Sequence, residues 1–170
     1  KEFDILADFK LKTTGDYSLL GKLKSKVFEI SYYSGLHVPT LFQSSYSGNH
    51  FQWDNEYNSS FINTLEAKVK INTNSIMLSP FIRLSSIKDY IYLSNEKNPT
   101  QDDEILINNQ FGVNLNLNLF NKIINLESRY SYNTVSKSSA DIFNIPKHHI
   151  YSRLFYNGKW FNNSIPVQFG

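Results

Sequence analysis

The sequence predicts an all-β chain that folds as an antiparallel up-and-down sheet and crosses a membrane as part of a β-barrel. Three observations predict this class: apolar and polar residues alternate along most of the chain, short turns alternate with long loops, and the composition favours strands. Aromatic residues make up 15% of the 170 residues, with 11 Tyr and 13 Phe. Such residues are enriched in strands, and the good helix former Met occurs once.

The alternation has a period of two residues, which separates side chains onto opposite faces of a strand. In residues 51–71, Leu65 and Val69 share one face with other apolar residues, whereas Glu66 lies on the opposite, polar face. Residues 105–119 repeat the pattern, with Ile and Leu on one face and Asn and Gln on the other. A helix would scatter both sets around its circumference, so these segments are predicted to be strands.

The same pattern predicts about eight strands, each bounded to within about 2–4 residues. They cover residues 2–13, 17–33, 51–71, 76–93, 104–119, 122–134, 147–158 and 164–170. A change of face near Glu29 predicts a β-bulge in the second strand. The connections after the second, fourth and sixth strands are long, whereas the others are short and rich in Gly, Asn and Asp. This alternation places the long loops at one end of the sheet, as in outer-membrane barrels.

Composition excludes several classes of protein. The net charge of +2 shows no concentrated basic face, so no nucleic-acid partner is expected. The absence of Cys excludes disulfides and thiolate metal sites. No run of about 18 apolar residues is present, which argues against a transmembrane helix. The mean hydropathy of −0.38 does not argue against a barrel, in which only alternate residues face lipid.

A barrel in lipid needs an apolar outer face, a polar lumen and aromatic rings near both interfaces. The residues predicted to face lipid are Phe9, Leu11, Leu65, Val69, Val113, Leu115 and Leu117. Those predicted to line the lumen are Lys10, Lys12, Lys22, Lys24, Lys26, Glu66, Lys68, Lys70, Arg83, Asn108, Gln110, Asn114, Glu127, Arg129 and Arg153. The predicted interface aromatics are Trp53, Tyr57, Tyr90, Tyr92, Tyr130, Tyr132, Phe120, Trp160 and Phe161.

Motifs for catalysis or cofactor binding are absent from the sequence. It contains no Gly-x-Ser-x-Gly, P-loop, Gly-x-Gly-x-x-Gly or HExxH pattern, so no catalytic residue, metal or cofactor is expected and the chain is not expected to be an enzyme. His148 and His149 would point to opposite faces of a strand. The acidic run 102–104 is interpreted as solvated rather than as a Ca²⁺ site. The row of Lys22, Lys24 and Lys26 could attract anions, but pairing with carboxylates such as Asp8 or Glu66 is favoured.

Eight strands could close by themselves, yet the last predicted strand, 164–170, is shorter than the others and stops in mid-pattern. An open sheet edge would leave unpaired backbone groups in lipid. Residues 1–170 are therefore expected to be a single segment of a larger barrel, truncated at its C-terminal end.

Residues 146–170 carry a polar strand with aromatic residues, a short aromatic turn, and a second strand with Gln and Gly. The residues that carry this motif are Tyr151, Leu154, Phe155, Tyr156, Trp160, Phe161, Gln168 and Gly170. This segment resembles a late hairpin of the Putative porin family of Bacteroidota. The resemblance implies an outer-membrane β-barrel with channel activity.

The leading functional hypothesis is passive diffusion of small polar solutes through a barrel in the bacterial outer membrane, with outer-membrane lipid as the surrounding partner. A second hypothesis is a structural or accessory barrel subunit of an envelope secretion or uptake complex, with other envelope proteins as partners. A third is a soluble, lipocalin-like ligand-binding barrel. Three sequence features count against the third: the strands are long, the long loops gather at one end, and neither a terminal helix pattern after the last strand nor a lipocalin Gly-x-Trp motif near the first strand is present.

Overall fold

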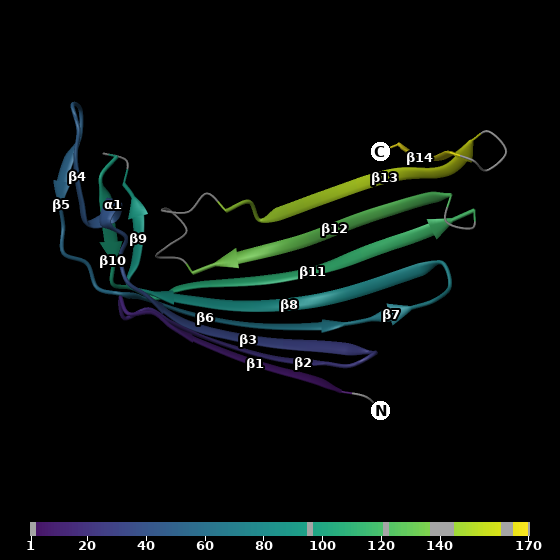
Figure 1. The fold of residues 1–170 in the computed structure, drawn as a ribbon, viewed down its shortest axis with the longest axis horizontal. Helices are drawn as coiled ribbons and strands as arrows, with labels where there is room; N and C mark the ends of the chain where they lie inside the picture. The colour runs from purple at the N-terminus through teal and green to yellow at the C-terminus, as the bar shows by residue number, and fades with distance from the viewer. Residues whose placement is uncertain (1–2, 95–96, 121–122, 137–144, 161–164, 170) are drawn as a thin grey trace.

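The main structural feature is one long, curved antiparallel sheet (Figure 1). The computed structural model describes residues 3–94, 97–120, 123–136, 145–160 and 165–169. The strands of this sheet are β1 (Asp4–Leu11), β2 (Tyr17–Lys24), β3 (Phe28–His37), β6 (Ser60–Val69), β7 (Ile71–Asn72), β8 (Ile76–Lys88), β11 (Leu106–Leu119), β12 (Ile124–Val135), β13 (His148–Trp160) and β14 (Ile165–Phe169).

The strands follow an up-and-down order, because each pairs antiparallel with the sheet strands next to it in sequence. The order is β1-β2-β3-β6-β8-β11-β12-β13-β14, and the short β7 also pairs with β8. The predicted all-β, antiparallel architecture is therefore confirmed. Within the described residues the sheet does not close: β1 and β14 lie at its two ends (Figure 1).

The second predicted strand is wrong, because residues 17–33 form two strands separated by a tight turn. The Ser25 hydroxyl accepts hydrogen bonds from the backbone N–H groups of Val27 at 3.2 Å and Phe28 at 3.1 Å. The Ser25 N–H group donates to the Phe28 carbonyl at 2.8 Å. A Ser hydroxyl can close a turn in this way without Gly or Pro. The predicted bulge at Glu29 is therefore a reversal of the chain.

This extra reversal changes the end of the sheet at which the first turn lies. The turn between β1 and β2 was predicted at the short-turn end, yet it lies with the long loops. Asp16 in that turn accepts a hydrogen bond from the backbone N–H of Val38, just after β3, at 2.6 Å. The three long connections still share one end, as predicted, and the β2–β3, β7–β8 and β11–β12 turns occupy the other (Figure 1).

Two predicted strands are too long. Residues 51–71 divide into β5 (Gln52–Asp54), a segment outside the strands, β6 and β7. Residues 76–93 divide into β8 and β9 (Tyr90–Leu93), with Asp89 between them at a φ of 54°. A positive φ takes the backbone out of the β region and ends the pairing of β8.

The long loops fold into an ordered layer at one end of the sheet. This loop layer consists of the described parts of residues 38–59 and 89–105. It contains the helix α1 (Leu41–Ser44), the pair β4 (Ser45–Ser47) and β5, and the pair β9 and β10 (Pro99–Asp102). Figure 1 shows these elements standing crosswise at the ends of the long strands.

Side chains join the two halves of the loop layer. The Tyr57 hydroxyl donates to the Pro99 carbonyl at 2.5 Å. Gln101 accepts from the Asn58 N–H at 2.9 Å and donates to the Asn58 carbonyl at 2.8 Å and to the Asp89 carbonyl at 2.9 Å. These bonds fix residues 38–59 against residues 89–105.

No helix in the described residues is long and apolar enough to span a bilayer.

Candidate functional site

The strand register separates charged and apolar side chains onto two faces of the sheet. Residues directly opposite one another on antiparallel strands point to the same face. The polar face carries Asp4, Asp8, Lys10, Lys22, Lys24, Glu29, Glu66, Lys68, Arg83, Asn108, Gln110, Asn114, Asn116, Asn118, Glu127, Arg129, Ser131, Asn133 and Arg153. The apolar face carries Ile5, Phe9, Leu11, Leu19, Leu23, Ile30, Leu65, Ala67, Val69, Ile71, Leu78, Ile82, Leu84, Phe111, Val113, Leu115, Leu117, Leu126, Ile150 and Leu154.

In the described part of the main sheet, almost all Asp, Glu, Lys and Arg residues lie on the polar face. Lys88 is the exception: it lies opposite Phe61 on the apolar face, at the loop-layer end of β8. The middle of the apolar face therefore carries no charge on the strands whose side chains are described.

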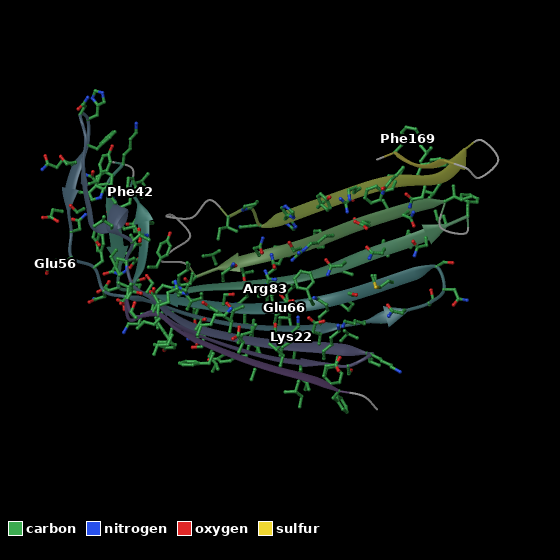
Figure 2. All side chains as sticks on the ribbon, viewed as in Figure 1. Lys22, Phe42, Glu56, Glu66, Arg83 and Phe169 are labelled. Carbon is green, nitrogen blue, oxygen red and sulfur yellow. The ribbon has the colours of Figure 1, made fainter. Side chains whose placement is uncertain are left out.

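Ion pairs cross between neighbouring strands on the polar face. Glu29 accepts from Lys22 and from Lys70, each with an N···O distance of 2.9 Å. Glu66 pairs with Arg83, whose Nε lies 2.7 Å from Oε2, and lies 3.4 Å from the Nζ of Lys68. Figure 2 shows Lys22, Glu66 and Arg83 close together near the middle of the sheet. These pairs balance much of the charge and tie β2, β3, β6 and β8 together.

Amide side chains extend this network across the sheet. Arg83 Nη1 donates to Gln110 Oε1 at 3.3 Å, and Gln110 Nε2 donates to Asn133 Oδ1 at 2.8 Å. Asn133 Nδ2 then donates to the Pro146 carbonyl at 3.0 Å. Asn133 and Ser131 are both buried, and Ser131 lies 3.4 Å from Gln110 Nε2. The polar face is therefore a connected hydrogen-bonded surface rather than a set of isolated side chains.

A glycine on the polar face makes room for an aromatic ring. Phe81, which is 7% exposed, lies over Gly112 on the neighbouring strand. A Cβ on Gly112 would lie 2.5 Å from the Phe81 ring and 2.6 Å from the Tyr130 carbonyl oxygen. The Arg129 guanidinium lies on this ring, 4.8 Å from its centroid. The missing side chain thus allows Phe81 to pack against the sheet and to support Arg129.

Two hollows open on the polar face. The larger, of about 1050 Å³, is lined by residues that include Asn116, Asn157, Glu127 and Arg153. The smaller, of about 660 Å³, lies beside it and shares Asn116 and Glu127 with it. Most of the residues that line each hollow have amide, hydroxyl or charged side chains, so the hollows lie on the hydrophilic side of the sheet.

The apolar face is exposed rather than packed into a core. Ile5 is 79% exposed, Phe9 63% and Leu154 60%. In the described residues, Phe81 and Leu106 are the only buried hydrophobic side chains. A soluble domain of this length would bury about 68–70% of the surface that its unfolded chain exposes. The apolar face is a surface that needs an apolar surrounding.

The structure places most of the predicted lumen residues on the polar face: Lys10, Lys22, Lys24, Glu66, Lys68, Arg83, Asn108, Gln110, Asn114, Glu127, Arg129 and Arg153. Lys70 lies between β6 and β7 and pairs with Glu29. The strand positions of Lys12 and Lys26 are corrected: Lys12 lies in the β1–β2 turn, where it pairs with Asp16 at 3.5 Å, and Lys26 lies in the β2–β3 turn.

All residues predicted to face lipid lie on the apolar face: Phe9, Leu11, Leu65, Val69, Val113, Leu115 and Leu117. Their contact with lipid stays a prediction. Tyr130 and Tyr132 lie on the same face near the loop-layer end of β12. Phe120 lies in the β11–β12 turn, where it is 71% exposed and has a φ of 50°.

Four predicted interface aromatics, Trp53, Tyr57, Tyr90 and Tyr92, were placed on the long strands and lie in the loop layer instead. Trp53 packs against Tyr46, with ring centroids 4.8 Å apart, and donates from Nε1 to the Phe42 carbonyl at 2.9 Å. Tyr90 and Tyr92 stack with centroids 5.7 Å apart. Trp160 is the last residue of β13, and Phe161 lies outside the described residues.

Burial and hydrogen bonds shift the pKa values of several groups in the loop layer and in the β1–β2 turn. Burial raises the pKa of Tyr90 to about 12, with smaller contributions from Tyr92 and Asp102. Burial also raises the pKa of Tyr57. The hydrogen bond from the Val38 backbone lowers the pKa of Asp16, and Thr14 and Lys12 lower it further. Asp16 is therefore ionised when it holds the β1–β2 turn against the end of β3.

The two adjacent histidines do not form a metal site by themselves. His148 lies opposite Tyr132 on the apolar face, and His149 lies opposite Ser131 on the polar face. The Nδ1 atom of His148 is 2.9 Å from the Tyr130 hydroxyl. Within the described residues, no three His, Asp or Glu side chains gather as metal ligands.

Glu29, which holds two lysines on the polar face, is one of the residues that sequence reasoning missed. It was assigned to a bulge, so its partners were not sought. The signal was the face change between Val27 and Phe28, which marks a turn followed by a new strand. With the turn placed there, Glu29 comes opposite Lys24 and Lys68 and within reach of Lys22 and Lys70.

Comparison with known proteins adds evidence that is independent of this geometry. A search of curated proteins found no match to the sequence. The sequence profile of the family described as Putative porin matches residues 1–170, which is the whole chain. The chain therefore belongs to the Putative porin family.

Proposed function

We propose that this sheet forms part of a closed β-barrel in the bacterial outer membrane and that its polar face lines a passage for the diffusion of small polar solutes. The apolar face would contact lipid, and the loop layer would lie at one mouth of the passage. The transport is passive, so selectivity would depend on the width and charge of the passage. No covalent chemistry is part of the proposal, and the chain is proposed not to be an enzyme.

The distribution of side chains between the two faces carries this proposal. The hollowed face is charged and hydrogen-bonded, whereas the opposite face is apolar, exposed and free of charge in its middle. A lipocalin-like barrel would show the reverse, with an apolar interior and a polar outside. Membership of the Putative porin family supports a porin-like role.

The length of the apolar band agrees with a bilayer. Along β11, Phe111, Val113, Leu115, Leu117 and Leu119 share the apolar face. This stretch rises about 26 Å at about 3.3 Å per residue. With a strand tilt of about 40°, it covers about 20 Å of membrane, close to the apolar band of about 25 Å found in such barrels.

An accessory role in an envelope complex is the second candidate, and one observation favours it. The loop layer exposes a group of apolar and aromatic side chains: Leu41 is 83% exposed and Phe42 59%, and Phe42 packs against Tyr46 and Trp53. Exposed aromatic groups on an ordered surface are frequent in protein interfaces. Other envelope proteins would be the partners.

Planar-bilayer recording of the purified full-length protein tests the proposal. Steady, ohmic single-channel conductance is expected for a diffusion pore. A refolded protein that is silent and co-purifies with a second envelope protein would favour the accessory role. Recovery of the folded protein in an aqueous extract without detergent would overturn both proposals and favour a soluble barrel.

A further inference from the structure

One cation in the middle of the polar face has no carboxylate partner among the described residues. Among the strand residues whose side chains the structure describes, the other cations of this face pair with Asp8, Glu29, Glu66 or Glu127, except for Lys24 at the turn end of β2. Arg129 takes part in none of these pairs, is partly buried, and lines the smaller hollow. It also lies opposite Asn114, halfway along β11.

The packing of Arg129 fixes its orientation without neutralising its charge. The guanidinium lies 4.8 Å from the centroid of the Phe81 ring, and that ring is held by the space over Gly112. A guanidinium can stack on an aromatic face and still present the N–H groups at its edge. Its N–H edge therefore remains available for a group that enters the hollow.

The neighbours of Arg129 carry further donors. Asn114 and Tyr151 lie directly opposite it on β11 and β13, and Ser131 and His149 form the next row. All of them line the same hollow of about 660 Å³. A planar cation surrounded by amide and hydroxyl donors suits carboxylates and phosphates, which accept paired hydrogen bonds from Arg.

We propose that Arg129 determines solute selectivity by forming a transient site for small anions that carry a carboxylate or phosphate group. This inference rests on the proposed function and specifies its solute class. The charge of the surrounding surface supports it, because strand cations outnumber carboxylates on the described polar face. The cations are Lys10, Lys22, Lys24, Lys68, Arg83, Arg129 and Arg153, and the carboxylates are Asp4, Asp8, Glu29, Glu66 and Glu127.

The test compares the full-length protein with Arg129→Gln in planar bilayers under a KCl gradient. The reversal potential gives the chloride-to-potassium permeability ratio. Arg129→Gln is expected to lower this ratio about two- to five-fold at low salt, because one unit charge acts strongly on an ion that passes within about 4 Å of it. Arg129→Lys is expected to keep the ratio, since it keeps the charge.

Lys88→Gln is the matched control, because it removes one positive charge from the opposite face of the sheet. It should leave the permeability ratio unchanged. Inorganic phosphate added to one chamber should reduce the chloride current of the unchanged protein and have a weaker effect on Arg129→Gln. Each variant is first checked for correct folding by the heat-dependent shift of its band in gel electrophoresis.

Three results would overturn the inference while the proposed function stands. The first is a conducting Arg129→Gln variant with an unchanged permeability ratio, and the second is an equal change of this ratio in Lys88→Gln. The third is a fall of the ratio in Arg129→Lys that is as large as in Arg129→Gln. The last result would assign the effect to disturbed packing on Phe81. Absence of conductance in the unchanged protein would instead overturn the proposed function itself.

Discussion

Placing one arginine on either face of the same strand gives the sharpest test of the membrane assignment. Leu115 and Asn116 are neighbours at the same depth on β11, near the centre of its apolar stretch from Phe111 to Leu119. Leu115 lies on the apolar face opposite Leu78 and Ser128. Asn116 lies on the polar face opposite Glu127. The two substitutions therefore add the same charge to two different environments.

The expected loss of stability in Leu115→Arg follows from the depth of Leu115 in the proposed bilayer. An arginine on the lipid face of a barrel near the bilayer centre costs about 2–4 kcal/mol. Leu115→Arg is therefore expected to reduce the folding equilibrium constant by about 30- to 900-fold. Asn116→Arg is expected to change stability by less than about 1 kcal/mol, because it adds a cation beside the carboxylate of Glu127 in a hydrated surface.

Reversible denaturant unfolding of the full-length protein in phospholipid vesicles measures both values, with tryptophan fluorescence as the signal and linear extrapolation to zero denaturant. Equal losses in the two variants would refute the assignment of faces. A larger loss for Asn116→Arg would indicate that the polar face contacts lipid, which would reverse the proposed orientation of the sheet.

Three other predictions follow from single contacts. Gly112→Ala should destabilise the fold by about 1–3 kcal/mol because its Cβ would overlap an aromatic ring, whereas Gly21→Ala, with nothing within 4 Å, should be nearly neutral; denaturant unfolding measures both. A double-mutant cycle of Arg83→Gln and Glu66→Gln should give a coupling energy of about 0.5–1.5 kcal/mol, a modest value because the Arg83 side chain is 39% exposed; zero coupling would contradict the ion pair. The pKa of Asp16 is lowered from 3.8, so its bond to a backbone N–H is formed at neutral pH and is lost as the pH falls through the lower folded value. Hydrogen exchange of that amide should therefore show protection that is full at pH 6 and falls once the pH drops below the lowered folded pKa, and this pH dependence should vanish in Asp16→Asn.

The sequence predicted the faces of the sheet better than the limits of its strands. Alternation reports which side of an extended chain each residue occupies, so Leu65 and Glu66 were placed on the correct faces. Alternation does not show which strands pair with one another. Apolar and polar residues alternate as regularly in 51–59 as in 60–69, yet residues 51–59 lie in the loop layer, where hydrogen bonds of Tyr57 and Asn58 join them to residues 99–101.

The missed turn shows a second limit of sequence reasoning. Ser25, Lys26 and Val27 contain no Gly, Pro, Asn or Asp, so the reversal had no strong turn signal. It is made by one hydroxyl and one backbone hydrogen bond, both of which depend on the pairing of β2 with β3. Partners on the polar face, such as those of Glu29, depend on the same register and could not be assigned before it was known.

The one-sided placement of charge also bears on how the strands select their partners. Shifting β8 by one residue against its neighbours would turn Arg83 into the apolar layer and expose Ile82 to the hydrated side. If the apolar face contacts lipid as proposed, such an error moves Arg or Lys into hydrocarbon at a cost of about 2–4 kcal/mol per residue near the bilayer centre. In the proposed membrane orientation, misaligned strands would therefore be disfavoured as the sheet inserts, and the rows of charged residues would favour the correct register during assembly.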